Sequence, residues 1–200
     1  LQMSVLQAQR SNQFFLNSKG YGFSLIEALV VIALLAIFAV FAIPMFGDLT
    51  QNNRMRAQIS NLMGQFTQAR TEAMRRGFRV TMCPGTESGC SGNKWENGFI
   101  AFVDTDADGV WDNSEEIILV GAALTGNNTM RSDQFSTFIS FRYDGASTAV
   151  DGSANPGSFV VCDSRGFGEH ARALNILATG RIKIFASNES GSGVTSCEGT

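Results

Sequence analysis

An uncharged apolar segment near the N-terminus constrains this chain more than any other feature of its sequence. Residues 28–46 contain nineteen consecutive positions without a charged side chain. About 20 apolar residues in a helix span the hydrocarbon core of a bilayer, so the sequence predicts a transmembrane helix. A secretory signal peptide would have a shorter apolar region and a small-x-small cleavage site. Here the segment passes Pro44 and continues as a second helical pattern.

A carboxylate lies in the same apolar region. Glu27 falls within the run from 23 to 46 and has no basic neighbour in the sequence. An unpaired carboxylate in such surroundings is unfavourable, which makes Glu27 a functional candidate. The alternative is that Glu27 only marks the helix end at the level of the lipid headgroups.

The residues around Glu27 resemble the cleavage and methylation motif of type IV prepilins and pseudopilins. Residues 22–27 read Gly-Phe-Ser-Leu-Ile-Glu. The resemblance implies that a prepilin peptidase cuts after Gly22 and that Phe23 becomes an N-methylated N-terminus. It also implies that Glu27, the fifth mature residue, pairs in a filament with the Phe23 amine of the neighbouring subunit. Pro44 falls where helices of this family usually carry a proline.

The first 22 residues would then be a leader peptide. They contain Arg10 and Lys19 and no acidic residue, which predicts a cytoplasmic location by the positive-inside tendency. The chain is therefore expected to cross the bacterial inner membrane once, with its head in the periplasm, and later to enter a pilus or pseudopilus filament.

Residues 47–77 show the pattern of an amphipathic helix. Their apolar side chains recur at spacings of three and four, which places them on one face. This stripe comprises Met55, Ile59, Leu62, Met63, Phe66, Ala69, Ala73 and Met74. Arginines on the opposite face are typical of a solvated or acid-paired surface. Gly77 predicts the end of a continuous helix that starts at Ser24.

Short β-type runs separated by Gly, Asn, Ser and Asp follow the helix. The expected strands are 78–82, 99–103, 117–120, 135–143, 159–162, 171–177 and 181–185. The sequence thus predicts an α+β fold in which a long N-terminal helix packs on a mostly antiparallel β-sheet head domain. The expected divisions are a leader peptide, 1–22, a transmembrane and filament-core helix, 23–46, an amphipathic helix, 47–77, and a periplasmic β-rich head, 78–200.

Several later stretches resemble, in order, the GspH/FimT branch of pseudopilins and FimU-like minor pilins. These stretches are 69–76, 80–83, 95–104, 115–119 and 178–181. The resemblance implies a minor pilin that takes part in assembly or initiation of a type IV pilus. A minor pseudopilin of type II secretion, of the protein H type, is the alternative. The implied partners are other minor and major pilins or pseudopilins, the prepilin peptidase and methyltransferase, and the inner membrane.

The cysteines are Cys83, Cys90, Cys162 and Cys197, and none forms a CxxC pair. An even number of cysteines favours disulfide bonds formed in an oxidising compartment. Three pairings are possible on paper. The short separation of Cys83 and Cys90 favours a local loop, which leaves Cys162 to pair with Cys197. Four buried thiols are the alternative.

An acidic segment fits the spacing of a twelve-residue calcium loop. Asp104, Asp106, Asp108, Asp112 and Glu115 occupy its first, third, fifth, ninth and twelfth positions. The flanking patterns indicate strands instead of the two helices of an EF-hand, and acidic hairpin loops are common. A plain turn is therefore the favoured interpretation, and calcium the alternative. No other cofactor is expected.

Basic residues near the C-terminus form a further candidate site, for DNA. Arg181 and Lys183 lie two positions apart and so share one face of the last expected strand, with Arg165 and Arg172 on neighbouring elements. Residues 180–183 resemble the Gly-Arg-x-Arg motif of FimT-type minor pilins used in DNA uptake, with Lys in place of the second Arg. A solvated edge strand is the favoured alternative.

Charge and motif content argue against two other classes of function. Fifteen basic and 18 acidic residues give a net charge of -3, and loss of the two basic leader residues makes it 13 minus 18, or -5. Such a chain does not coat nucleic acid, so DNA contact would need a local basic patch. The single histidine, His170, lies in a Gly-rich turn, and no nucleophile elbow, metalloprotease helix or phosphate-binding loop occurs. The sequence therefore predicts no enzymatic activity.

Overall fold

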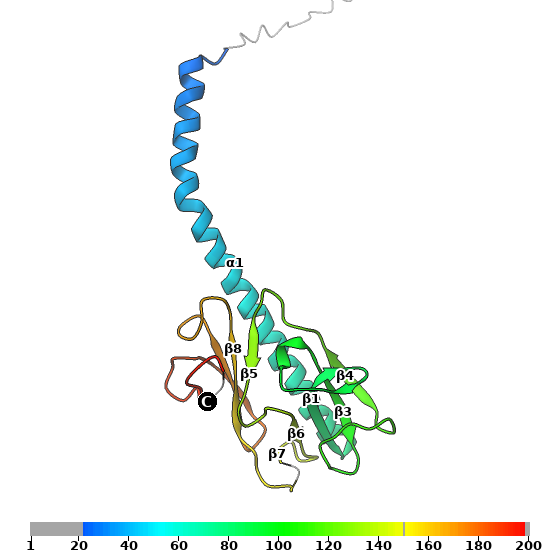
Figure 1. The fold of residues 1–200 in the computed structure, drawn as a ribbon. Helices are drawn as coiled ribbons and strands as arrows, with labels where there is room; N and C mark the ends of the chain where they lie inside the picture. Colours follow the sequence, from blue (N-terminus) through cyan, green and yellow to red (C-terminus); the bar gives the residue numbers. More distant parts are fainter. Residues whose placement is uncertain (1–21, 150, 199–200) are drawn as a thin grey trace, which may run out of the picture. The chain divides into compact units, whose positions relative to one another are not determined.

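A computed structural model describes residues 22–149 and 151–198. It divides the chain into two compact units, Leu1–Met45 and Phe46–Thr200. One long helix, α1 (Leu25–Arg76), contributes residues to both units (Figure 1). The predicted helix from Ser24 to Arg76 is thus confirmed to within one residue, whereas the predicted leader, apart from Gly22, lies outside the described residues.

The membrane-span prediction has a qualified outcome. Within the described ranges, no single helix meets the length and hydropathy expected of a membrane span. The segments Leu25–Val40 and Met45–Arg76 meet both requirements only when taken together across a break. Pro44 falls between them, where a proline removes one backbone hydrogen bond of a helix. Its side chain lies outside what the structure describes.

The second half of α1 buries one face in the head. The buried stripe comprises Met55, Ile59, Leu62, Phe66, Ala69 and Ala73, none more than 4% exposed. Met74, in contrast to the prediction, is 41% exposed, because it lies about 100° around the helix from Ala73. Gly77 ends the helix as predicted: its φ is 73°, and its amide donates a hydrogen bond to the Ala73 carbonyl at 3.0 Å.

Two antiparallel sheets follow the helix. The first contains six strands, in the order β4-β3-β1-β6-β7 with β2 paired to β1, and the second has the order β10-β9-β8-β5. The first comprises β1 (Arg79–Thr86), β2 (Gly89–Cys90), β3 (Phe99–Asp104), β4 (Ile117–Gly121), β6 (Ile139–Phe141) and β7 (Ser147–Thr148). The second comprises β5 (Thr129–Arg131), β8 (Gly157–Cys162), β9 (Arg172–Ile176) and β10 (Ile182–Ala186). A single 3-10 turn, η1 (Trp95–Asn97), precedes β3. The predicted α+β class is confirmed.

The expected strands differ from the observed ones mainly around residues 135–143. Only β6 forms there. Phe135 lies in a turn, and its amide donates a hydrogen bond to the Ser132 hydroxyl at 3.1 Å. β2, β5 and β7 were not predicted, since strands of two or three residues are too short to show a period.

One apolar core joins α1 to both sheets, which lie against its C-terminal half in Figure 1. Phe66 of α1 is fully buried, and its ring centroid lies 5.2 Å from that of Phe159 on β8 and 6.0 Å from that of Phe99 on β3. The Trp95 ring lies 6.1 Å from Phe66, and its indole N–H donates to the Phe135 carbonyl at 2.8 Å. The helix and the two sheets therefore share the same aromatic contacts.

Both favoured disulfide bonds are present. Cys83 of β1 is bonded to Cys90 of β2 across a hairpin, and Cys162 of β8 is bonded to Cys197 in the C-terminal tail. The tail also places Val194, 7% exposed, in a second apolar cluster with strand residues of the second sheet. The alternative of four free thiols therefore does not hold in this structure.

Ion pairs connect the end of α1 to the residue before β4. The Glu72 carboxylate accepts hydrogen bonds from Arg75 at 2.6 Å and from Arg76 at 2.8 Å, and Arg76 also pairs with Glu116 at 2.6 Å. The hydrogen bonds from Arg75 and Arg76 lower the pKa of Glu72 to about 2. This part of the arginine face is acid-paired, as the charge pattern indicates.

Truncation of Phe66 should destabilise the head strongly. Phe66→Ala removes a buried ring and leaves a cavity, so we expect a loss of about 3–5 kcal/mol in the free energy of unfolding. Phe78→Ala is the matched control, because the Phe78 side chain is 52% exposed and its loss should change stability by less than about 1 kcal/mol. Urea unfolding of the full chain in detergent, followed by tryptophan fluorescence, measures both. Equal losses would contradict a core centred on Phe66.

The two disulfide bonds should contribute unequally to stability. The sequence separations are 35 for Cys162–Cys197 and 7 for Cys83–Cys90, and loop-closure entropy then gives about 4 and about 2 kcal/mol. Double Cys→Ser variants of each pair, compared in the same urea experiment, measure the difference. A larger loss for the Cys83–Cys90 pair would show that packing of these sulfurs outweighs loop closure.

Glu72 should make part of the stability of the head depend on acid pH. Its pKa is lowered in the folded state, so its contribution is present above the unfolded value near 4.5 and is lost as the pH falls toward about 2. Thermal unfolding of wild type and Glu72→Gln between pH 2 and 7 tests this. The wild type should melt at the higher temperature at neutral pH, and the two curves should converge near pH 2. A difference that stays constant across the range would argue against the charge.

Candidate functional site

The first candidate site is the start of α1. Ser24 caps the helix: its hydroxyl accepts a hydrogen bond from the Glu27 amide at 3.2 Å, and its carbonyl accepts one from the Ala28 amide at 3.1 Å. Glu27 lies in the first turn, where the helix dipole favours a negative charge. The role of Ser24 as a helix cap was not predicted, although the spacing Ser-x-x-Glu is a sequence signal for such a cap.

The residues before the cap are open to solvent in the described chain. Gly22 and Phe23 precede the helix in non-helical backbone, and Phe23 is 79% exposed. The peptide bond between them therefore lies outside the helix. A peptidase binds its substrate in an extended form, which a helix would prevent.

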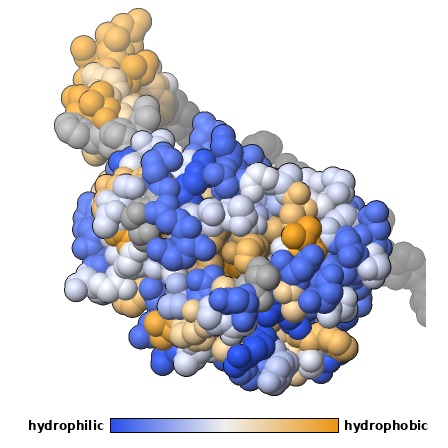
Figure 2. Space-filling model, turned by 60° about the horizontal axis from the view of Figure 1, so that its bottom comes forward, coloured by the Kyte–Doolittle hydropathy of each residue, from blue (hydrophilic) through white to orange (hydrophobic). Residues whose placement is uncertain are grey.

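Apolar side chains cover the first half of α1 on every side. Leu29, Val30, Val31 and Ile32 are consecutive, so their directions go once around the helix, and each is at least 46% exposed. Residues further along repeat the pattern: Leu34, Leu35, Ile37, Phe38, Val40 and Met45. Figure 2 shows this segment as apolar, in contrast to the mixed surface of the head. A helix of this kind needs lipid or other helices around it.

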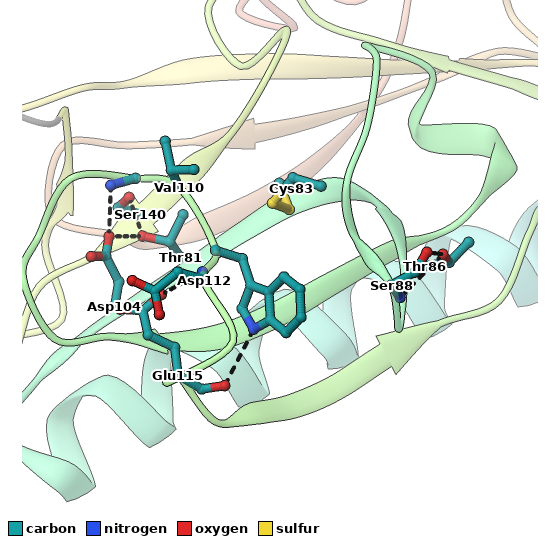
Figure 3. The surroundings of a disulfide bond; sticks show 12 residues. Thr81, Cys83, Thr86, Ser88, Asp104, Val110, Asp112, Glu115 and Ser140 are labelled. Carbon is teal, nitrogen blue, oxygen red and sulfur yellow. Dashed lines mark hydrogen bonds between the residues drawn. A yellow bond between two sulfur atoms is a disulfide. The ribbon is translucent and has the colours of Figure 1, made fainter.

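The second candidate site is the loop between β3 and β4. Asp104, the last residue of β3, is 1% exposed. Its Oδ2 accepts hydrogen bonds from the Thr81 hydroxyl at 2.6 Å and from the Gly109 amide at 3.2 Å (Figure 3). Its Oδ1 is buried and has no hydrogen-bond partner among the described residues. One oxygen from each of Asp104, Asp106 and Asp108 lies within 4.8 Å of the other two.

Burial disfavours the ionised form of two carboxylates at this site, those of Asp104 and Glu115. Desolvation raises the pKa of Asp104, although the Thr81 hydrogen bond and the Arg79 charge act against it. Desolvation also raises the pKa of Glu115, and the negative charges of Asp104 and Asp106 add to this rise. Acidic groups are thus held close together at the end of β3.

The structure does not gather all five acids of the calcium-loop pattern. The Glu115 carboxylate accepts hydrogen bonds from the amides of Thr105 at 2.8 Å and Asp112 at 3.4 Å. Asp112 in turn accepts from the amide and hydroxyl of Ser114 at 2.9 and 2.5 Å. These two side chains therefore shape the turn, and the flanking elements are strands, as the sequence indicates.

The third candidate site is the basic pair at β10, an edge strand of the second sheet. The strand register places Lys183 opposite Asn175 on β9, and Arg172 opposite Ala186. Lys183 and Ala186 are three positions apart, so Lys183 and Arg172 project from opposite faces of the sheet. Arg181 is exposed and directly precedes β10.

Arg165 is also separate from this pair. Its guanidinium bonds to Asp163 at 2.6 Å and lies 3.7 Å from a carboxylate oxygen of Asp48 on α1. The hydrogen bond to Asp163 raises the pKa of Arg165 further. Of the four basic residues considered for DNA, Arg165 and Arg172 are thus separate from Lys183, and Arg181 is exposed directly before β10.

Comparisons with known proteins bear on both ends of the chain. The family model for type II transport protein GspH matches residues 58–180, and the model for the prokaryotic N-terminal methylation motif matches residues 17–43. A search of curated proteins gives no match.

A comparison with solved structures gives two minor subunits, and the likeness to the first of them shows the fold. The type IV minor pilin FimU of Pseudomonas aeruginosa is 18% identical with a TM-score of 0.55, covering 74% of this chain and 98% of that one. The minor pseudopilin EpsH of the type 2 secretion system of Vibrio cholerae is 10% identical with a TM-score of 0.43, covering 68% and 99%. The GspH model matches more than half of this chain, and the methylation motif precedes it. The chain therefore belongs to the GspH family and is a minor pilin or pseudopilin, a structural subunit.

Proposed function

We propose that this chain is a minor pilin of a type IV pilus that takes part in pilus assembly or initiation. It is stored in the inner membrane as a single-pass protein with its head in the periplasm, and it then joins the filament. The observation that carries the proposal is the apolar circumference of the first half of α1, which starts directly after Glu27. Lipid satisfies this surface before assembly, and the helices of neighbouring subunits satisfy it afterwards.

Processing follows from the same segment. Prepilin peptidase cuts between Gly22 and Phe23, and the new amine of Phe23 is N-methylated. The non-helical backbone at these two residues and their match to the methylation motif support this step. In the filament, the Glu27 carboxylate pairs with the Phe23 amine of the adjacent subunit, because an unpaired charge among packed helices is strongly unfavourable.

A minor pseudopilin of type II secretion is the second candidate, and the description of the matching family favours it. Both candidates use the same helix and the same Glu27 contact, so the helix does not separate them. A strain that lacks the gene, compared with the same strain carrying a restored wild-type copy, separates them. Loss of pili with normal secretion supports the pilus role, and normal pili with loss of secretion supports the secretion role.

DNA uptake is a third candidate and has less support. The exposed Arg181 and the partly buried Lys183 favour it, but the separation of Arg165 and Arg172 reduces the basic patch to two residues. Normal pili and normal secretion with reduced transformation in the same deletion strain would support this role.

Charge at residue 27 should decide filament entry. We expect Glu27→Val to insert in the membrane at wild-type levels but to be lost from sheared filaments, because the Phe23 amine of its neighbour is then left without a partner. Glu27→Gln should also fail, although Gln serves as well as Glu in a helix cap. Immunoblots of membrane and sheared fractions measure both steps.

Two results would contradict the pairing role. Glu87→Val is the matched control, since Glu87 is exposed in the turn between β1 and β2, and it should enter filaments normally. If Glu27→Gln also entered normally, the charge of Glu27 would not be needed for filament entry. If Glu87→Val failed equally, the defect would not be specific to position 27.

A further inference from the structure

The carboxylate of Asp104 has an arrangement that the fold alone does not require. The side chain is 1% exposed, and Thr81 and Gly109 both bond to the same oxygen, Oδ2. The other oxygen, Oδ1, is buried and has no hydrogen-bond partner in the described part of the chain. A buried carboxylate oxygen without a protein partner is rare in native proteins and marks a position where a ligand can bind.

The orientation of this carboxylate is fixed by a buried network. The Thr81 hydroxyl, which lies on β1, also bonds to the Ser140 hydroxyl of β6 at 2.6 Å, and both residues are fully buried (Figure 3). Three neighbouring strands therefore hold Asp104 in place. Oδ1 is the oxygen that remains available to bind a ligand.

Two further carboxylates converge on Asp104 from the loop. Asp106 and Asp108 are exposed, and one oxygen of each lies within 4.8 Å of the other and of an Asp104 oxygen. Arg79 supplies one positive charge nearby, and its guanidinium donates to the Ala107 carbonyl at 3.1 Å. Three carboxylates thus meet one arginine, and two further positive charges, as on a divalent cation, would balance them.

We propose that Asp104, Asp106 and Asp108 bind a hard divalent cation, with calcium preferred. Oxygens bound to one calcium ion at about 2.4 Å lie at most about 4.8 Å apart, and the three carboxylates satisfy this upper limit. Calcium accepts irregular sets of carboxylate and water oxygens, whereas magnesium requires near-octahedral geometry and loses water reluctantly. The buried Asp104 oxygen favours the ion that dehydrates more easily. The exposed Asp106 and Asp108 leave the site open to solvent and complete the shell with water.

Calorimetric titration of the chelator-treated full-length chain in detergent with calcium chloride tests the site. Wild type should bind one ion with a dissociation constant of about 0.1–1 mM, in the range of extracellular calcium modules. Asp106→Asn, an exposed substitution that leaves folding intact, should weaken binding at least about tenfold. Asp112→Asn is the matched control: it removes the same charge from the same loop outside the cluster, and it should bind as wild type.

Thermal unfolding with and without calcium provides a second measurement, in which wild type and Asp104→Asn should behave differently. Calcium should raise the melting temperature of wild type. Asp104→Asn should melt higher than wild type without calcium, because it relieves the buried charge, and should not respond to the ion. Absence of calcium binding at millimolar concentration, or an equal loss in Asp112→Asn, would overturn the site. Equal affinity for magnesium chloride would overturn the preference for calcium.

Discussion

Packing of one face of α1 against both sheets is the interaction on which the head depends. Phe66 contacts aromatic rings that come from β3, β8 and η1, so none of these elements has a complete apolar environment without the helix. The sheets have few strands each, and a small sheet with one uncovered apolar face is not stable alone. The helix therefore supplies an apolar face that packs against both sheets in one core.

The two halves of the same helix differ in their side-chain pattern, as expected for two different environments. Apolar residues surround its first half, whereas a stripe at spacings of three and four marks its second half. This contrast made the helix, its end at Gly77 and its buried face predictable from the sequence. Both disulfide bonds were predictable as well, because a seven-residue separation fits a hairpin and leaves a single remaining pair. Most strands followed from short β-type runs.

Other features depend on contacts that no local pattern records. The strand β5 has three residues and forms because it pairs with β8, more than 25 positions further along the chain. The opposite faces of Lys183 and Arg172 follow from the register of β9 and β10, and a sequence alone does not give that register. The acidic spacing allowed five calcium ligands as the alternative to a plain turn, but hydrogen bonds to the loop backbone engage Glu115 and Asp112. The burial of Asp104 depends on Thr81 and Ser140 from two other strands.

The C-terminal tail covers an apolar strip that the second sheet turns away from α1. Val194 packs there with Val160, Ala171 and Ala173, and the Cys162–Cys197 bond ties this cover to β8. The tail thus replaces a third layer with about a dozen residues and one covalent bond. Its removal would leave a sheet face of aliphatic side chains in water, and such faces promote association between copies. Truncation of the chain before Val194 would therefore expose an apolar surface on the head through which copies of the chain could associate.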